Sequence, residues 1–225
     1  MSQGELFTGS SPEIGEVEER LRAEGIRTVI GVDEAGRGPL AGPVHAAAFW
    51  LDLASPLPAA LEELNDSKKL QESTRERLFD ALENEGRPMA IGVCQAEVID
   101  EINVLQATFR AMRSAVEEVI EAVGEPPELI LVDGNMIIPG VDWKQEAFIK
   151  GDARSQAIAA ASILAKVSRD RVMREADKKW PQYGFLSNKG YGSAMHRKAL
   201  RKFGPCELHR RSFAGVLPEG EPIGE

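Results

Sequence analysis

The chain has 225 residues, of which 43% are hydrophobic and 28% charged, and this composition is typical of a globular protein with one sizeable core. No apolar run approaches the length that spans a membrane, and the acidic start lacks the basic and hydrophobic regions of a signal peptide. We therefore expect a cytoplasmic monomer without membrane contact. Cys94 and Cys206 form no CxxC motif, which argues against a zinc site or a disulfide framework.

The formal net charge of -9 argues against a nucleic-acid partner only if it is taken as an average over the chain. Residues 166–211 contain thirteen Lys and Arg against four Asp and Glu, whereas the remainder contains fourteen against thirty-two. A basic segment on an acidic body is typical of a groove that binds a polyanion. A solvated helical face is the alternative interpretation.

Periodicity and turn residues predict an α/β protein that forms a single domain. Ser73 and Glu76 have the spacing of a capping box at the start of one predicted helix. Helices are expected at residues 13–24, 56–64, 73–84, 96–103, 104–123, 153–167 and 193–203. Strands are expected at residues 28–32, 44–51, 88–95, 129–132 and 143–149, the first two as a hairpin.

The most informative stretch is residues 28–44, TVIGVDEAGRGPLAGPV, in which an apolar run ends in Asp33 and Glu34. The run then breaks into Gly36-Arg37-Gly38, whose glycines permit backbone angles closed to other residues. Side chains alternate along a strand, so both acids reach one site only if the strand ends there and Glu34 already belongs to the turn. A solvated loop would also tolerate these acids.

Two further acids stand at the ends of predicted elements. Asp133 follows the apolar run 129–132, and Asp152 precedes an alanine-rich helix, where capping of that helix is the alternative role. Because sites in open sheets gather where strand ends meet loops, we expect these acids to converge with Asp33 and Glu34. Four carboxylates favour Mg²⁺ or Mn²⁺, and two such ions would support in-line hydrolysis of a phosphodiester.

One aromatic residue, Tyr191, and one lysine, Lys68, are candidates for substrate contact. Tyr191 lies in a loop that mixes aromatics, glycines and a lysine, which suits stacking on a sugar or base; packing on the core is the alternative. Lys68, in the polar loop 65–70, would contact a phosphate or simply be solvated.

Four linked motifs carry a resemblance to a known family: VDEAGRGPLAGPV, VDGN, KGDARSQAIAAASILAKVSRDR, and YGFLSNKGYGSAMH followed by GPCELHRRSF. In matching order, from about Val29 to Val216, they closely resemble the type 2 ribonucleases H, specifically ribonuclease HII of bacteria. The resemblance implies a ribonuclease-H-like mixed sheet flanked by helices, with a helical C-terminal portion. It also implies a catalytic domain at residues 28–216, an N-terminal extension at 1–27 and a tail at 217–225.

The resemblance further implies an endonuclease that cuts RNA paired with DNA and incises duplex DNA 5′ of a single embedded ribonucleotide. Its substrates would be RNA/DNA hybrids and ribonucleotide-containing duplex DNA, its cofactor Mn²⁺ or Mg²⁺, and its products a 3′-hydroxyl and a 5′-phosphate. The metal-binding and catalytic carboxylates would be Asp33, Glu34, Asp133 and Asp152. The backbone of Gly36, Arg37 and Gly38 would sense the ribose 2′-hydroxyl, and Tyr191 would stack on the following deoxyribose. The alternatives are a binding protein without catalysis and a phosphatase acting on small esters.

Overall fold

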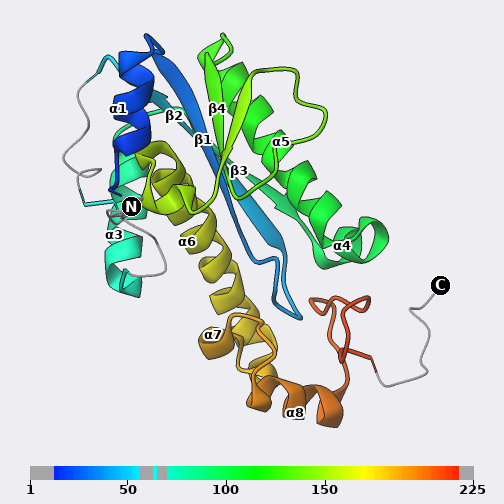
Figure 1. Cartoon of the computed structure of the whole chain (residues 1–225). Coiled ribbons are helices and arrows are strands. Elements are labelled where there is room, and N and C mark those ends of the chain that lie inside the picture. The colour runs from blue at the N-terminus through cyan, green and yellow to red at the C-terminus, as the bar shows by residue number, and fades with distance from the viewer. Residues whose placement is uncertain (1–12, 56–62, 65–69, 218–225) are drawn as a thin grey trace, which may run out of the picture.

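The computed structural model describes residues 13–55, 63–64 and 70–217, and their centre is one five-stranded mixed sheet (Figure 1). The strand order is β3-β2-β1-β4-β5. The central strand β1 pairs antiparallel with β2 and parallel with β4, so the predicted hairpin is confirmed. The strands are β1 (Thr28–Ala35), β2 (Val44–Asp52), β3 (Met89–Cys94), β4 (Leu129–Asp133) and β5 (Gln145–Phe148).

Helices cover both faces of the sheet, because its strands are apolar on both sides. Helix α5 packs on β2 and β3 and α6 on β1 and β2, which produces two separate hydrophobic clusters. The helices are α1 (Glu16–Ala23), α3 (Glu72–Asn84), α4 (Ala96–Ile102), α5 (Val104–Val123), α6 (Gln156–Lys179), α7 (Phe185–Asn188) and α8 (Ala194–Phe203), with 3₁₀ turns η1 (Gly151–Ala153) and η2 (Pro181–Tyr183).

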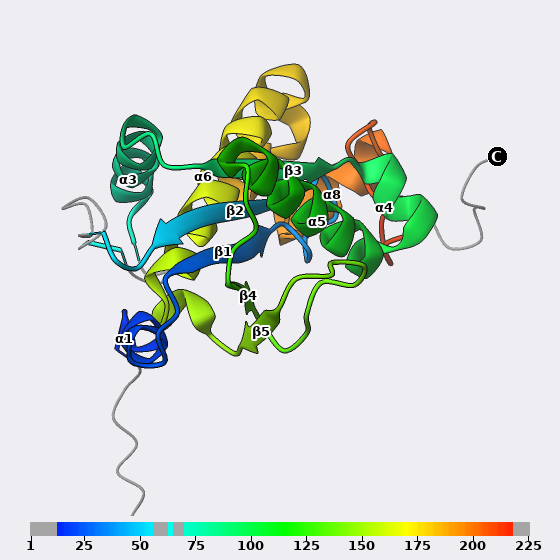
Figure 2. The ribbon, with the colours of Figure 1, turned by 90° about the horizontal axis from the view of Figure 1, so that it is seen from above.

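The 24-residue helix α6 connects the sheet to a helical C-terminal portion. At about 1.5 Å per residue it is roughly 36 Å long, so its second half extends past the sheet. Figures 1 and 2 show α1 beside the start of α6 and α8 near its far end. A third hydrophobic cluster forms there, in which Met173 of α6 packs with Tyr183, Phe185 and Leu200. The predicted fold class, a mixed sheet with flanking helices and a helical C-terminal portion, is confirmed.

Three details of the sequence prediction are wrong. Strand β1 continues through Glu34 to Ala35, because both residues remain paired with β2. Helix α6 begins at Gln156 instead of residue 153, since Ser155 caps it by accepting from the Ile158 amide. It also runs beyond residue 167 to Lys179.

The third error concerns α3, whose N-cap is Gln71 and has no side-chain capping bond. The predicted capping box of Ser73 and Glu76 does not form. Glu76 instead binds Arg171 and Arg174 of α6 across the helix interface. Most of the helix predicted at residues 56–64 lies outside the described residues.

Within the described part of the chain, none of the helices combines the length and the apolar character needed to cross a membrane.

Candidate active site

The carboxyl ends of β1 and β4 lie next to each other at one edge of the sheet. These strands run parallel with Val32 opposite Val132, so Asp33 and Asp133 lie side by side directly after the last paired residues. Asp33, Glu34 and Asp133 line one open pocket of about 480 Å³. The same pocket is lined by Gly36, Arg37, Gly38 and Tyr191, together with Ala35, Arg75, Ser162, Lys166 and Arg169. The fold thus brings seven of the predicted site residues to one place.

Asp33 is the most buried carboxylate of this pocket, with 4% of its surface exposed. Its Oδ1 accepts a hydrogen bond from the Glu34 amide at 2.7 Å, and its side chain is also hydrogen-bonded to Ser162 of α6. Burial raises the pKa of Asp33 well above its usual value, and repulsion from Asp133 and Glu34 raises it further. Burial and mutual repulsion of the carboxylates therefore disfavour the charged form of Asp33.

Glu34 reaches the pocket although it follows Asp33 directly in the strand. Adjacent side chains on a strand point to opposite faces, and Glu34 also borders the cavity formed by Thr108 and Met112 of α5. At the end of the sheet both directions open onto the pocket, so no turn at Glu34 is needed. Its carboxylate lies 3.5 Å from Arg37 Nη1, which partly neutralises it.

Asp133 connects the strand edge to the segment that carries Asp152. Its Oδ1 accepts a hydrogen bond from the Gly151 amide at 2.7 Å, immediately before Asp152 in turn η1. Asp152 is 5% exposed and, contrary to the alternative role, is not the N-cap of α6. The structure therefore places Asp152 next in the chain to a residue that Asp133 holds, although Asp152 is not among the residues that line the 480 Å³ pocket.

The donor set suits a hard divalent cation, because it consists of carboxylate oxygens without cysteine or histidine. In the described ranges, no three Asp, Glu, His or Cys side chains are arranged as a ready-made ligand cage. Asp33, Glu34 and Asp133 line one pocket, and repulsion from the other two contributes to the raised pKa of Asp33. The residues fit a cation in type and charge, and their side chains would have to close around it.

Two buried arginines hold the loop of residues 36–43, called the glycine loop below, beside the carboxylates. Arg169 of α6 donates to the carbonyls of Ala41 and Pro43, and also to that of Lys189, at 2.9–3.1 Å. Arg210 donates to four carbonyls of the same loop, those of Gly36, Arg37, Pro39 and Gly42. Both arginines are at most 1% exposed. Because buried carbonyls need donors, these contacts fix the path of the loop.

Gly36 is required by this arrangement. Its φ of +101° favours glycine, and a Cβ atom there would lie only 2.1 Å from Arg169 Nε. At Gly38, a Cβ would instead meet only the Tyr191 ring, at 3.5 Å. Gly38 and the Tyr191 ring thus lie next to each other in the lining of the pocket.

Tyr191 is 51% exposed, so the alternative of a core contact is wrong. Its backbone is held from behind by a chain of two histidines. His196 Nδ1 donates to the Tyr191 carbonyl at 2.9 Å, which leaves Nε2 to accept from His209 Nε2 at 3.0 Å. His209 Nδ1 accepts from the Cys206 amide at 2.9 Å.

His196 and His209 belong to the basic segment 166–211, but neither lies on the surface. Both are at most 2% exposed. Burial lowers the pKa of His196, and burial with the neighbouring His196 lowers the pKa of His209 to about 4. Both rings are therefore neutral at physiological pH, as their hydrogen bonds require.

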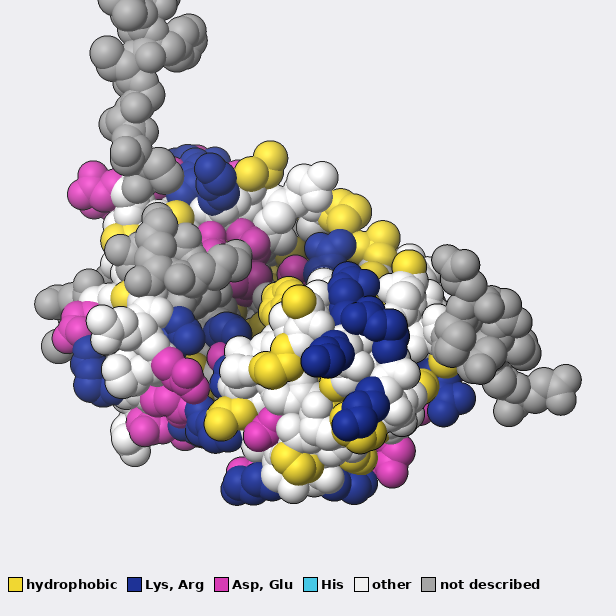
Figure 3. All heavy atoms as spheres, turned by 90° about the horizontal axis from the view of Figure 1, so that it is seen from below, with side chains coloured by type: hydrophobic (Ala, Val, Ile, Leu, Met, Phe, Trp, Pro, Cys, Tyr) yellow, Lys and Arg dark blue, Asp and Glu magenta, His cyan; other side chains and the backbone are white. Residues whose placement is uncertain are grey.

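Exposed basic residues of segment 166–211 form a surface near this pocket. Figure 3 shows lysine and arginine side chains gathered beside a hollow that contains acidic side chains. Helix α8 buries Ala199 and Leu200 and turns its basic residues to solvent. These exposed residues are Arg197, Lys198, Arg201 and Lys202. Lys68, the remaining predicted contact, lies outside the described residues.

Sequence reasoning missed Ser162, Arg169 and Arg210. Ser162 and Arg169 share a buried stripe of α6 with Ala165 and Met173, at spacings of three and four residues. A polar or charged residue on an apolar helical stripe was the available signal for both. Arg210 carried no local signal, because its partners are 168–174 residues away in the chain.

Comparisons with known proteins agree with this geometry. The model of the family described as Ribonuclease HII matches residues 30–216. The chain is 46% identical to the Ribonuclease HII of Syntrophotalea carbinolica, over 94% of this chain and 97% of that protein. It is 48% identical to that of Caldanaerobacter subterraneus subsp. tengcongensis, over 90% of this chain and 80% of that protein.

Solved structures show the same fold. The ribonuclease H2 of Pyrococcus horikoshii OT3 superposes with a TM-score of 0.70 at 26% identity, over 84% of this chain and 95% of that chain. A Bst-RNase HIII in complex with Mn²⁺ gives a TM-score of 0.73 at 20% identity, over 96% of this chain and 75% of that chain.

The sheet, its acidic edge and these structural neighbours define the class of protein, a nuclease with the fold of the type 2 and type 3 ribonucleases H. Within that class, the chain belongs to the ribonuclease HII family. The predicted family and the predicted enzyme class, an endoribonuclease, are confirmed.

Proposed function

We propose that this protein hydrolyses the RNA strand of RNA/DNA hybrids and incises duplex DNA on the 5′ side of a single embedded ribonucleotide. The products would be a 3′-hydroxyl and a 5′-phosphate. The observation that carries this proposal is the shared pocket, in which Asp33, Glu34 and Asp133 lie beside the Gly36-Arg37-Gly38 loop and Tyr191. Acids suited to hydrolysis thus adjoin a backbone loop suited to reading a sugar.

Recognition of the ribonucleotide would come from the loop and the tyrosine. RNA differs from DNA at a given sugar only by the 2′-hydroxyl, which can donate and accept hydrogen bonds. A glycine backbone allows close approach to that group. Arg169 and Arg210 would keep the loop in one conformation through their hydrogen bonds to its carbonyls. The Tyr191 ring lies next to Gly38, so a sugar bound at the loop would also lie next to the ring.

Hydrolysis would depend on Mn²⁺ or Mg²⁺ held by Asp33, Glu34, Asp133 and Asp152. When bound, two such cations would supply the activated water and the charge neutralisation that in-line phosphodiester hydrolysis needs. Asp33 is held in place by Ser162 and the Glu34 amide, and Asp133 by the Gly151 amide. Lys166 and Arg75 line the same pocket and would neutralise the scissile or an adjacent phosphate.

Duplex binding would extend from the pocket onto the basic surface of α8. Lysines and arginines that neutralise phosphates release counterions, so affinity should fall steeply with salt concentration. This surface favours a polymeric substrate over a small phosphate ester, because a small ester would leave α8 without a role.

The test compares Asp33→Asn with Asp142→Asn, which makes the same chemical change at an exposed position. Each protein is incubated with duplex DNA containing one ribonucleotide, with the all-DNA duplex and with an RNA/DNA hybrid, in Mn²⁺, Mg²⁺ or chelator. We expect Asp33→Asn to lower cleavage on the order of 1,000-fold or more while salt-sensitive duplex binding survives, and Asp142→Asn to match wild type.

Each alternative has its own outcome in this experiment. Unchanged cleavage by Asp33→Asn would refute the role of Asp33. Duplex binding by wild type without any metal-dependent product would indicate a binding protein. Release of phosphate from p-nitrophenyl phosphate, without cleavage of either duplex, would indicate a phosphatase.

A further inference from the structure

Helix α1 lies in a part of the chain that the family model does not match, and it buries a carboxylate against the N-terminus of α6. Glu18 of α1 has no exposed surface. Its Oε1 accepts from the Ser155 hydroxyl at 2.6 Å and from the Ala157 amide at 3.2 Å. These two donors are the N-cap and a first-turn amide of α6, which α6 itself cannot satisfy.

Glu18 thereby also fixes the direction of the Ser155 hydroxyl. A hydroxyl has one donor, and Ser155 uses it toward Glu18, so its lone pairs face the Ile158 amide at 3.2 Å. The negative charge of Glu18 also lies at the positive end of a 24-residue helix dipole. One buried carboxylate therefore supports the Ser155 cap at which α6 begins.

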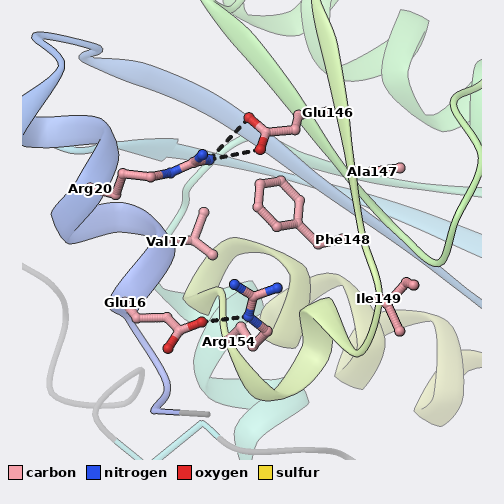
Figure 4. A pocket seen from close by; sticks show the side chains of 8 residues that line it. All are labelled: Glu16, Val17, Arg20, Glu146, Ala147, Phe148, Ile149 and Arg154. Atoms are coloured by element: carbon pink, nitrogen blue, oxygen red, sulfur yellow. Dashed lines mark hydrogen bonds and ion pairs between the residues drawn. The ribbon is translucent and has the colours of Figure 1, made fainter. Parts of the chain in front are cut away.

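The N-terminal end of α1 also contacts Arg154, the residue before Ser155. The Gly15 amide donates to the Arg154 carbonyl at 2.9 Å, and the Arg154 guanidinium pairs with Glu16. Figure 4 shows this pair and the Arg20–Glu146 pair on either side of Phe148, along a pocket of about 530 Å³ between α1 and β5. Segment 154–157 is thus held by α1 through backbone, side-chain and charge contacts.

Asp152 lies two residues before this segment, in a turn closed by it. The amides of Arg154 and Ser155 both donate to the Gly151 carbonyl, at 2.9 and 2.8 Å, and the Gly151 amide donates to Asp133. The turn that carries Asp152 therefore has Asp133 on one side and α1 on the other. A shift of segment 154–157 would move Asp152 relative to Asp133.

We propose that Glu18 is a positioning residue for Asp152, and that α1 is part of the catalytic unit instead of a dispensable extension. Glu18 is not among the residues lining the catalytic pocket, so it acts through Ser155 and Ala157. The inference rests on the proposed role of Asp152 as a metal-binding carboxylate. Residues that orient metal ligands typically change metal affinity or activity by about 10- to 100-fold when they are removed.

The experiment compares Glu18→Ala, Glu18→Gln and the neighbouring Glu19→Ala, which changes an exposed position of the same helix. Mn²⁺ affinity is measured by titration calorimetry on the full chain without substrate. Hydrogen exchange at the Ala157 amide is measured in metal-free protein, and kcat and KM are measured on duplex DNA with one ribonucleotide.

We expect Glu18→Ala to weaken Mn²⁺ binding about 10-fold, to lower kcat by a similar factor with little change in KM, and to speed exchange at Ala157. Glu18→Gln keeps an acceptor at Oε1 and should recover most of the metal affinity. Glu19→Ala should match wild type. Equal metal affinity and kcat in Glu18→Ala and Glu19→Ala would overturn the inference, as would equal losses in Glu18→Ala and Glu18→Gln.

If Glu18→Ala does not fold, the Mn²⁺ affinity of Ser155→Ala tests the inference instead, because this variant lacks the hydroxyl through which Glu18 acts. Lowered Mn²⁺ affinity supports the inference, and unchanged affinity overturns it. A wild-type protein that neither binds Mn²⁺ nor cleaves would refute the proposed function itself. A wild-type protein that does both, with Glu18→Ala equal to its control, would refute only the role of Glu18.

Discussion

Replacement of Gly36 by alanine tests whether the glycine loop is held as rigidly as the structure indicates. The new Cβ would lie 2.1 Å from Arg169 Nε and 2.8 Å from the Pro43 carbonyl oxygen, at a φ of +101°. The left-handed backbone costs an L-residue about 1–2 kcal/mol, and overpacking a filled site costs about 1–3 kcal/mol more. The free energy of unfolding should therefore fall by about 2–5 kcal/mol.

The same change should damage recognition. To restore normal contact, the loop or Arg169 must move by about 1 Å, and a misplacement of that size near reacting groups costs about 100-fold in rate. We expect kcat/KM on duplex DNA with one ribonucleotide to fall by about that factor. At about 2–4 °C per kcal/mol for a protein of this size, the melting temperature should fall by roughly 4–20 °C.

Two control variants separate the causes. Gly25→Ala has a φ of +83° with no atom within 4 Å, so it reports backbone strain alone. Gly38→Ala meets only Tyr191 Cε1, at 3.5 Å, and should leave stability nearly unchanged. Thermal unfolding and cleavage assays measure all three. If Gly36→Ala costs no more stability than Gly25→Ala and retains wild-type cleavage, the loop is not clamped and the argument fails.

Tyr191→Ala should reduce the kcat/KM preference for an embedded ribonucleotide over an all-RNA hybrid by about 5- to 150-fold, since one stacking contact is worth about 1–3 kcal/mol. Tyr191→Phe keeps the ring and the preference; an unchanged ratio in Tyr191→Ala would rule out stacking. The free energy of unfolding should decrease as the pH is lowered, because His209 has a pKa of about 4 in the folded protein and 6.5 in the unfolded chain. Between these values the unfolded chain binds more protons than the folded protein. From pH 7 to pH 5 this residue should cost about 2 kcal/mol in urea unfolding, and a His209→Gln variant with the same pH slope would contradict it.

The parts of this site that could be predicted are those determined by local sequence. Apolar runs ending in Asp33 and Asp133 predicted that both acids lie near the ends of strands, and the parallel pairing of those strands brings the acids together. The segment around Asp152 was predicted less well. Ser155 competes with Asp152 for the N-cap, and the outcome depends on Glu18, which lies 137 residues away from Ser155 in the chain.

The glycine loop could be predicted as a loop but not as a rigid one. Its carbonyls are satisfied by Arg169 and Arg210, which sequence analysis counted among the cations of a binding surface. Whether a basic residue is buried or solvated depends on acceptors brought together by the fold. Lysines and arginines of α8 stay exposed because that helix buries only its apolar face.

The two halves of the pocket are therefore stabilised by different physical means. The acidic half, formed by Asp33, Glu34 and Asp133, is electrostatically unfavourable: burial and repulsion raise the pKa of Asp33, which is held in place by Ser162 and the Glu34 amide. The glycine half is favourable by itself, because seven backbone carbonyls accept hydrogen bonds from the guanidinium groups of two buried arginines. Substitutions among the acids should consequently lower activity without lowering stability, as often happens at sites that trade stability for function. Substitutions around Arg169, Arg210 and Gly36 should lower both together, so paired unfolding and cleavage measurements distinguish a chemical role from a structural one.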